Sequence, residues 1–294
     1  FDRMIGIITG ILEQGLIFGI MALGVYITVK ILDFPDLSVD GTFPLGGAVA
    51  ASLILHGINP WLAMITAFFC GALAGMLTGF LNVKLKIPDL LSGILTMTAL
   101  YSVNYRIAGA PNVFLMGEKT IFTELPFALP SSAANYSDLF VLVFIVLIVK
   151  ICLDLYLKTK SGFLLRSVGD NPNLVITLAQ NPGKIKIIGL AIANGLVCMA
   201  GCINSMKNVQ FDISGGTGTL VMGLAAVIIG TSLFSKVRFI KVTTAVFGGM
   251  IIYKACIVAA ISSGLQSSDM NLVITVLFVI TLIINRYAES KRRD

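Results

Sequence analysis

Charged side chains are scarce in this 294-residue chain, where Asp, Glu, Lys and Arg together make up 12% of the residues. A typical soluble domain carries about 25%. There is one histidine, His56, and one tryptophan, whereas hydrophobic residues make up 56%. A chain this apolar cannot bury its surplus in one core, because its surface must still face a solvent. The scarcity of charge excludes an ordinary soluble domain and indicates that the solvent is lipid.

Catalytic and metal-binding patterns are also missing. The chain has no Gly-x-x-x-x-Gly-Lys-Ser/Thr phosphate loop, so we do not expect it to hydrolyse ATP. The five cysteines lie in apolar runs without histidine nearby, which is typical of packing residues. We therefore expect a protein that is not an enzyme, with no metal site and no cofactor of its own.

Nine apolar stretches are candidates for membrane spans, since a helix needs about 17–25 apolar residues to cross a bilayer. One of them, 42–56, is short for a crossing, and we interpret it as a half helix or as a span that begins in an extended stretch. No separate soluble domain or linker is visible, so the sequence predicts a single all-α membrane domain over 1–294. The nine spans are predicted at about 8–31, 42–56, 60–82, 89–107, 138–157, 185–206, 218–234, 240–262 and 269–285.

Lys and Arg segregate to alternate loops, and loops rich in them face the cytoplasm. Opposite loops carry only Arg3, Lys119 and Lys207. We expect the C-terminus and the 158–184 loop in the cytoplasm and the N-terminus outside. This asymmetry accounts for the net charge of +6, so we expect no nucleic-acid partner. The cytoplasmic set is Lys30, Lys84, Lys86, Lys158, Lys160, Arg166, Lys184, Lys186, Lys236, Arg238, Lys241, Arg286, Lys291, Arg292 and Arg293.

An internal echo relates residues 36–41 to residues 212–218, at an offset of 176. Each segment follows a long span and opens a run of small residues, with the first expected at the inner side and the second at the outer side. This pattern is typical of the inverted repeats of transporters, whose broken helices flank a central pathway. The alternative is that small residues only pack helices closely. The candidate pathway or gate residues are Asp36, Ser38, Asp40, Gly41, Asp212, Ser214, Gly215 and Gly216.

Polar residues at the two segments are also candidates for helix caps. We expect Ser38 or Asp40 to cap the helix after the first segment, and Ser214 or Thr217 the helix after the second. Elsewhere in the spans, Lys150 and Asp154 lie four residues apart and are expected to pair. The roles of Glu13 and Lys254 stay open between structural pairing and the lining of a pathway.

The inner loop 158–184 contains a second helix-cap signal. Asp170 or Asn171 can cap a short helix that has Pro172 at its first position. That helix would place Leu174, Val175, Leu178 and Ala179 on one side. A short amphipathic helix of this kind suits a groove of a partner protein, and the alternative is a helix that lies on lipid.

Three stretches in this chain resemble a known family. The motif Gly162-x-x-x-Arg166-x-x-Gly169-x-Asn171-Pro172, running into 184–188, is similar to the coupling region of permeases of the ribose and branched-chain amino acid class of ABC importers. Residues 36–39 and the Gly-rich stretch 212–232 match the same family, in the same order. The wording of 33–41 resembles most closely the subgroup of tryptophan and tyrosine importers. One difference from the ribose-type permeases is that they have an N-terminal span in addition to the nine spans predicted here.

The resemblance implies the permease subunit of an ATP-driven importer that moves a small solute, an amino acid or a related metabolite, by alternating access. It implies a homodimer in the bacterial plasma membrane, two ATPase subunits that bind ATP and Mg, and an extracytoplasmic substrate-binding protein. An ion-coupled secondary transporter is the alternative, since it would also use an inverted repeat and buried charges. The residues assigned to ATPase coupling are Gly162, Arg166, Gly169, Asn171, Pro172, Leu174 and Leu178.

Overall fold

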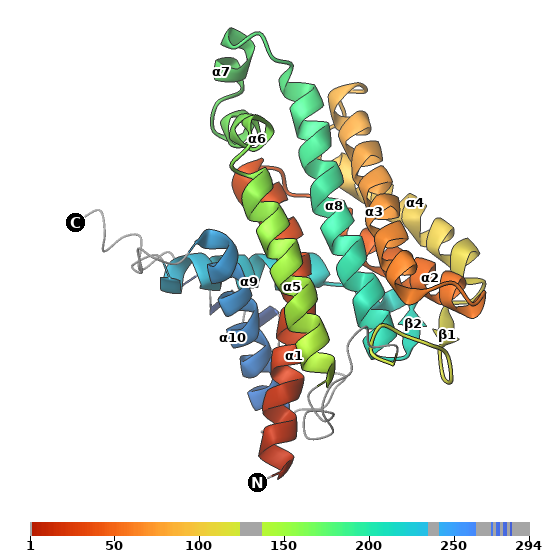
Figure 1. The fold of residues 1–294 in the computed structure, drawn as a ribbon. Coiled ribbons are helices and arrows are strands. Elements are labelled where there is room, and N and C mark those ends of the chain that lie inside the picture. Colours follow the sequence, from red (N-terminus) through yellow and green to blue (C-terminus); the bar gives the residue numbers. More distant parts are fainter. Residues whose placement is uncertain are drawn as a thin grey trace.

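The computed structural model describes residues 2–123, 137–234 and 241–262, together with the helical positions Leu272, Thr275, Val276, Val279, Ile280 and Ile283. Helices dominate this part of the chain (Figure 1). In order they are α1 (Asp2–Val25), which continues as the π-helical turn η1 (Tyr26–Ile31), α2 (Val39–Leu55), α3 (Pro60–Val83), α4 (Asp89–Ala108), α5 (Ser137–Tyr156), α6 (Lys160–Asp170), α7 (Pro172–Thr177), α8 (Pro182–Lys207), α9 (Thr219–Leu233) and α10 (Val242–Ser262).

Six segments of the described chain are long and apolar enough to cross a membrane, which confirms the all-α membrane class. The helix α4 is long enough, but its Thr, Ser, Tyr and Asn residues leave it less apolar than those six. The span predicted at 269–285 lies mostly outside the described residues, so the count of nine remains approximate. The six are Ile5–Ile31, Pro60–Val83, Ser137–Tyr156, Pro182–Lys207, Ile213–Leu233 and Val242–Ser262.

The short helix α2 follows a stretch without regular secondary structure, in which Asp33 has a positive φ of 51°. Residues 33–36 are not helical, and Phe34 and Asp36 in this stretch are fully buried. Irregular backbone at membrane depth is tolerated where protein surrounds it. The turn after α2 also has a local cause, because the Asn59 side chain accepts a bond from the Trp61 amide at 2.9 Å and Pro60 opens α3.

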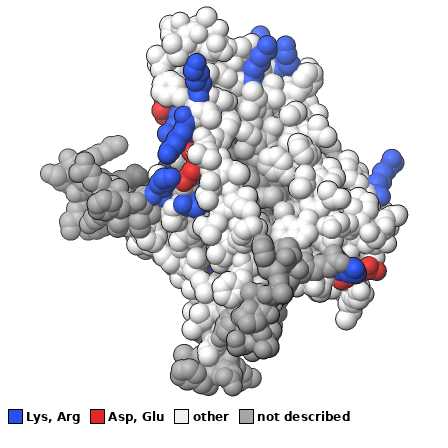
Figure 2. Space-filling model, in the orientation of Figure 1, with Lys and Arg blue, Asp and Glu red and all other residues white. Residues whose placement is uncertain are grey.

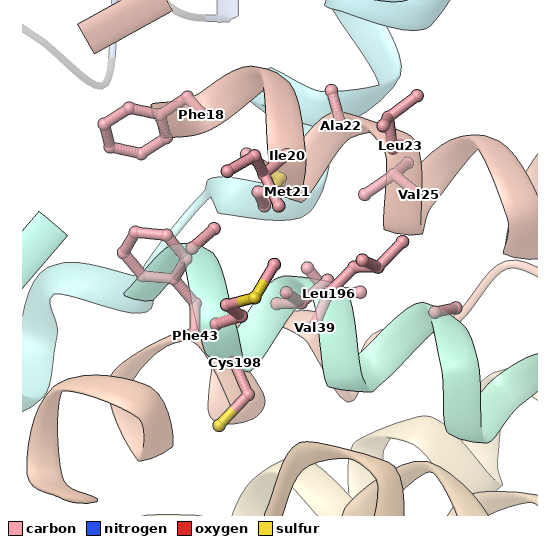
Figure 3. Packing of buried hydrophobic residues seen from close by; sticks show 14 of the residues in the cluster. Phe18, Ile20, Met21, Ala22, Leu23, Val25, Val39, Phe43, Leu196 and Cys198 are labelled. Atoms are coloured by element: carbon pink, nitrogen blue, oxygen red, sulfur yellow. The ribbon is translucent and has the colours of Figure 1, made fainter. Parts of the chain in front are cut away.

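The core is organised around α8, the most buried of the six segments, which packs against α1, α2 and α3 (Figure 1). Figure 3 shows the side chains between these helices, with the rings of Phe18 (α1) and Phe43 (α2) face to face. Their centroids are 5.4 Å apart and the rings are stacked. Leu196 and Cys198 of α8 belong to the same buried cluster. This packing fixes the positions of α1, α2 and α8 around the polar residues described below.

The molecule has two distinct ends (Figure 1). One carries α6 and α7, and we call it the α6–α7 end. The other carries the start of α1 and a two-stranded antiparallel ribbon, β1 (Asn112–Phe114) with β2 (Gln210–Asp212), in which Val113 faces Phe211; we call it the β-ribbon end. Most of the Lys and Arg side chains visible in Figure 2 lie in the half that carries α6 and α7.

The chain crosses between these ends in opposite directions in α1 and α8 (Figure 1). After each of them an irregular segment leads into a short helix: 33–38 leads into α2, and β2 with the 3-10 turn η3 (Ile213–Gly216) leads into α9. This antiparallel relation is what an inverted repeat requires.

Candidate functional site

A buried polar network joins the irregular stretch before α2 to the middle of α8. The Asp36 carboxylate accepts a bond from the Ser38 amide at 2.9 Å and another from the Asn194 side-chain amide at 2.8 Å. The Ser38 hydroxyl donates to the Asn194 carbonyl oxygen at 3.1 Å. All three residues are fully buried. The three side chains satisfy one another, so the network fixes the irregular backbone to the central helix.

A second contact joins the start of α2 to the start of α9. The Asp40 carboxylate accepts bonds from the Leu220 amide at 2.8 Å, the Thr219 hydroxyl at 2.9 Å and the Gly218 amide at 3.2 Å. These amides are among the unpaired donors at the N-terminus of α9, where a negative charge is stabilising. Asp40 therefore caps a helix that begins 179 residues later in the chain.

The two segments of the internal echo meet closely at one glycine. Pro44 lies inside α2 and has no amide hydrogen to donate to the carbonyl of Asp40, one turn earlier. That carbonyl oxygen faces Gly216 instead, and a β-carbon at Gly216 would overlap it. Only glycine permits this approach. The predicted gate segments are thus in direct contact at this point, although the sequence pattern predicted them at opposite sides of the membrane. We call the residues Asp36, Ser38, Asp40, Asn194, Gly216 and Thr219 the polar junction.

The other predicted pathway residues lie around the polar junction. Gly41 is buried against α4, where its carbonyl accepts a bond from the Asn104 side chain at 3.0 Å. Asp212, Ser214 and Gly215 are exposed near the β-ribbon end. Asp212 accepts a bond from the Ser214 amide at 2.8 Å and caps η3.

The predicted side chains do not cap the helices that follow them. Ser38 occupies the N-cap position of α2 but makes no capping bond, because its hydroxyl binds Asn194. The N-cap of α9 is Gly218, not Ser214 or Thr217, and Asp40 supplies the missing acceptor. These bonds connect residues far apart in the chain, which a local cap rule does not consider.

The loop 158–184 contains two helices, α6 and α7, where the sequence indicated one. The predicted one is α7: Asn171 accepts a bond from the Asn173 amide at 3.1 Å, and Pro172 is at its first position. The helix α6 begins at a Thr159 cap, whose hydroxyl accepts a bond from the Gly162 amide at 3.3 Å.

The helix α6 packs tightly on the end of α1. A β-carbon at Gly169 would overlap the carbonyl oxygen of Ile31, the last residue of η1. Leu165, on the same helix, is fully buried and lies close to Gly189 of α8. Gly169 therefore lets α6 lie directly against the end of η1, and one residue, Leu32, separates Ile31 from the irregular stretch 33–36 that contains Asp36. The other assigned coupling glycine, Gly162, lies against the backbone of Tyr156 and Leu157 at the end of α5.

Several apolar side chains are exposed on α6, on α7 and just after α7, a segment that we call the α6–α7 hairpin. Val175 is fully buried, so α7 is anchored by one face while its other face is free. Arg166 is exposed and lines a cavity between α1, α5, α6 and α10 rather than the free face of α7. The exposed apolar residues of this hairpin are Phe163, Leu174, Ile176 and Leu178.

Charged residues in the spans have local partners. Glu13 pairs with Lys207 at 2.9 Å, and Lys207 also pairs with Asp138 at 2.6 Å, near the β-ribbon end. The predicted Lys150–Asp154 pair is present at 3.8 Å. The Lys254 ammonium lies 3.6 Å from the ring centroid of Phe18. These contacts favour structural roles for Glu13 and Lys207.

Three residues of the site were not among the site residues predicted from the sequence. Asn194 was visible as a polar residue in an apolar span, but nothing in the sequence indicated its partner. Thr219 reads as an ordinary helix residue. Ile31 contributes only its backbone carbonyl, and no side-chain pattern could reveal that contact.

Known proteins give this geometry a context. The profile of the family described as the permease component of branched-chain amino acid transport systems matches residues 7–284. The chain is 44% identical to the tyrosine transport system permease protein of Clostridioides difficile, over 94% of this chain and 90% of that protein. It is 28% identical to a probable branched-chain amino acid transport permease of Methanocaldococcus jannaschii, over 82% and 78%.

A ribose import permease of Escherichia coli is 26% identical over 76% of this chain and 68% of its own length. No solved structure matches the chain. The family match covers the helices, the polar junction and the α6–α7 hairpin together. The chain belongs to the family of branched-chain amino acid transport permeases, and it is a multi-pass plasma membrane protein that forms the permease subunit of an ABC importer.

Proposed function

We propose that this permease imports an aromatic amino acid of the tyrosine type. The support is its 44% identity, over nearly the whole of both chains, to a protein named as a tyrosine transport permease. The permeases named for ribose and branched-chain amino acids are more distant, at 26% and 28%. A small zwitterion with an aromatic ring is therefore the substrate class that the comparisons favour.

The assembly we propose is a homodimer of this chain with two cytoplasmic ATPase subunits and an extracytoplasmic substrate-binding protein. ATP and Mg bind to the ATPases, since the chain has no phosphate loop. The α6–α7 end faces the cytoplasm and the β-ribbon end faces outside, because Lys and Arg gather on the former. The N-terminus is then outside and the C-terminus inside.

The motion starts at the α6–α7 hairpin. Its exposed apolar residues, Leu174 and Leu178 among them, dock in a groove of the ATPase, and ATP binding displaces the hairpin. The displacement reaches Ile31 through the contact at Gly169. From there it passes along the irregular stretch 33–36 to Asp36 and Asp40, which are hydrogen-bonded to α8 and α9. The polar junction thus serves as the gate between the outward-open and inward-open states.

The observation that carries this proposal is the exposed apolar face of α7 on a hairpin anchored by Val175. The test replaces Leu174 and Leu178 with Glu and measures how much ATPase co-purifies with the permease. We expect the ATPase to be lost while the permease remains folded in detergent. The matched control replaces Phe114 and Met116 with Glu; both are apolar and more exposed than Leu174 and Leu178, and they lie near the β-ribbon end. If the L174E/L178E protein retains its ATPase, the docking assignment is wrong.

The substrate is tested separately with the reconstituted complex and its binding protein. We expect tyrosine to stimulate ATP hydrolysis at concentrations at which leucine and ribose do not. A complex that leucine stimulates better than tyrosine would contradict the substrate assignment and leave the docking assignment intact.

A further inference from the structure

A polar cavity of about 410 Å³ opens at the α6–α7 end, between η1, α5, α6 and α10. It is distinct from the polar junction and from the exposed apolar face of α7. Its lining combines hydroxyl groups with charged side chains from four different elements. The polar residues that line it are Tyr26, Asp154, Lys158, Arg166, Lys241 and Thr243.

The charges around this cavity do not balance. Asp154 is the one carboxylate in the lining, and it already accepts bonds from Lys241 at 2.8 Å and Thr243 at 2.8 Å. Its second cation is Lys150, at 3.8 Å. Lys158 and Arg166 are exposed and make no ion pair with any residue that the structure describes. Within the part of the chain that the structure describes, these two cations of the lining therefore have no carboxylate partner.

The face of α5 below the cavity is apolar. Residues 147, 151 and 154 lie along one face of α5, at spacings of four and three, and Lys158 lies in the turn that follows the helix. Leu147 and Ile151 are about half exposed, and both precede Asp154 and Lys158 on the way to the α6–α7 end. The surface thus changes from apolar to charged toward the α6–α7 end. A phospholipid has the same order, with acyl chains followed by a phosphate.

We infer that this cavity binds the phosphate of an anionic phospholipid, with Lys158 and Arg166 as its ligands and the Leu147–Ile151 face of α5 against its acyl chains. Arginine suits the phosphate because its guanidinium can donate two parallel bonds. The bound headgroup would join α6 to α5, and Tyr26 places the first residue of the π-helical turn at the same cavity. The lipid would then stabilise the packing of α6, the first helix of the coupling hairpin, against α5.

The test needs no ATPase and no transport substrate. Purified permease in detergent is titrated with phosphatidylglycerol, phosphatidylcholine or inorganic phosphate, and the thermal unfolding midpoint and the lipids retained in native mass spectrometry are recorded. We expect phosphatidylglycerol alone to raise the midpoint. The K158Q/R166Q protein should require about 25-fold more phosphatidylglycerol, since each basic residue near an anionic lipid contributes a factor of about five.

The matched control is K84Q/K184Q, which removes two exposed cations from the same end but outside the cavity. It should bind phosphatidylglycerol as the unmodified protein does. An equal effect of phosphatidylcholine, an unchanged titration of K158Q/R166Q, or an equal loss in the control would each overturn the proposal. An equal effect of inorganic phosphate would reject the lipid and assign the site to the free anion. If the double variant does not fold, K158Q alone should show the fivefold weakening.

Discussion

The removal of the Asp40 carboxylate should destabilise the protein through a helix in a distant part of the sequence. Asp40 accepts three bonds from the first residues of α9, and two of them come from backbone amides that would otherwise lack partners. The loss of an N-capping side chain costs about 1 kcal/mol. The loss of a partly buried charge at a helix N-terminus costs about 1 kcal/mol more. We therefore expect Asp40→Ala to lower the free energy of unfolding by about 2 kcal/mol.

Two comparisons separate this effect from a general loss of packing. Asp40→Asn keeps an acceptor oxygen without the charge, so it should lose only about 1 kcal/mol. Asp212→Ala removes a carboxylate that makes the same kind of bond, at 2.8 Å to Ser214, but on an exposed turn. The loss there should be about 0.5 kcal/mol. The assay is reversible unfolding in mixed micelles of increasing SDS content. If Asp40→Ala costs no more than Asp212→Ala, the reasoning about α9 is refuted.

Three further predictions concern the polar junction and the coupling hairpin. In the resting protein, a cysteine at position 214 should react with a water-soluble thiol reagent, whereas one at position 38 should react only in a nucleotide state that opens the gate; labelling of Ser38→Cys without nucleotide would contradict the burial of the gate. Asn194→Ala leaves an oxygen of the buried Asp36 carboxylate without a donor and should cost about 3 kcal/mol in SDS unfolding, so a loss below about 1 kcal/mol would speak against the network. Gly169→Ala should preserve ATPase binding but abolish the stimulation of ATP hydrolysis by substrate, because the methyl group would push α6 away from the end of η1. Normal stimulation would show that the displacement of the hairpin does not pass through this contact.

Much of the helical framework could be predicted because its signals are local. The turn between α2 and α3 lies where the predicted spans 42–56 and 60–82 are separated, and the Asn59 cap and the Pro60 ring that form it act within two residues. The helix α7 was recognised from Asn171 and Pro172 in the same way. The short length of α2 followed from its apolar run, which is shorter than a bilayer requires.

The remaining features depend on contacts between distant parts of the chain. The helix α6 was missed because Gly162 and Gly169 are typical of loops, whereas here they allow backbone to approach backbone. The bond from Asn194 to Asp36 joins residues 158 positions apart. The β-ribbon was missed because each strand has three residues, too few for an alternating pattern.

The contact of Gly169 with Ile31 has a mechanical consequence. Where side chains separate two helices, rotamer changes can absorb part of a displacement before it reaches the neighbouring element. No side chain separates the two backbones here, so α6 and the end of η1 form a rigid link. Such a link either transmits the whole displacement of α6 to η1 or breaks. Substitutions at this point should therefore give transporters that are either fully coupled to ATP hydrolysis or inactive in transport, with few intermediate phenotypes.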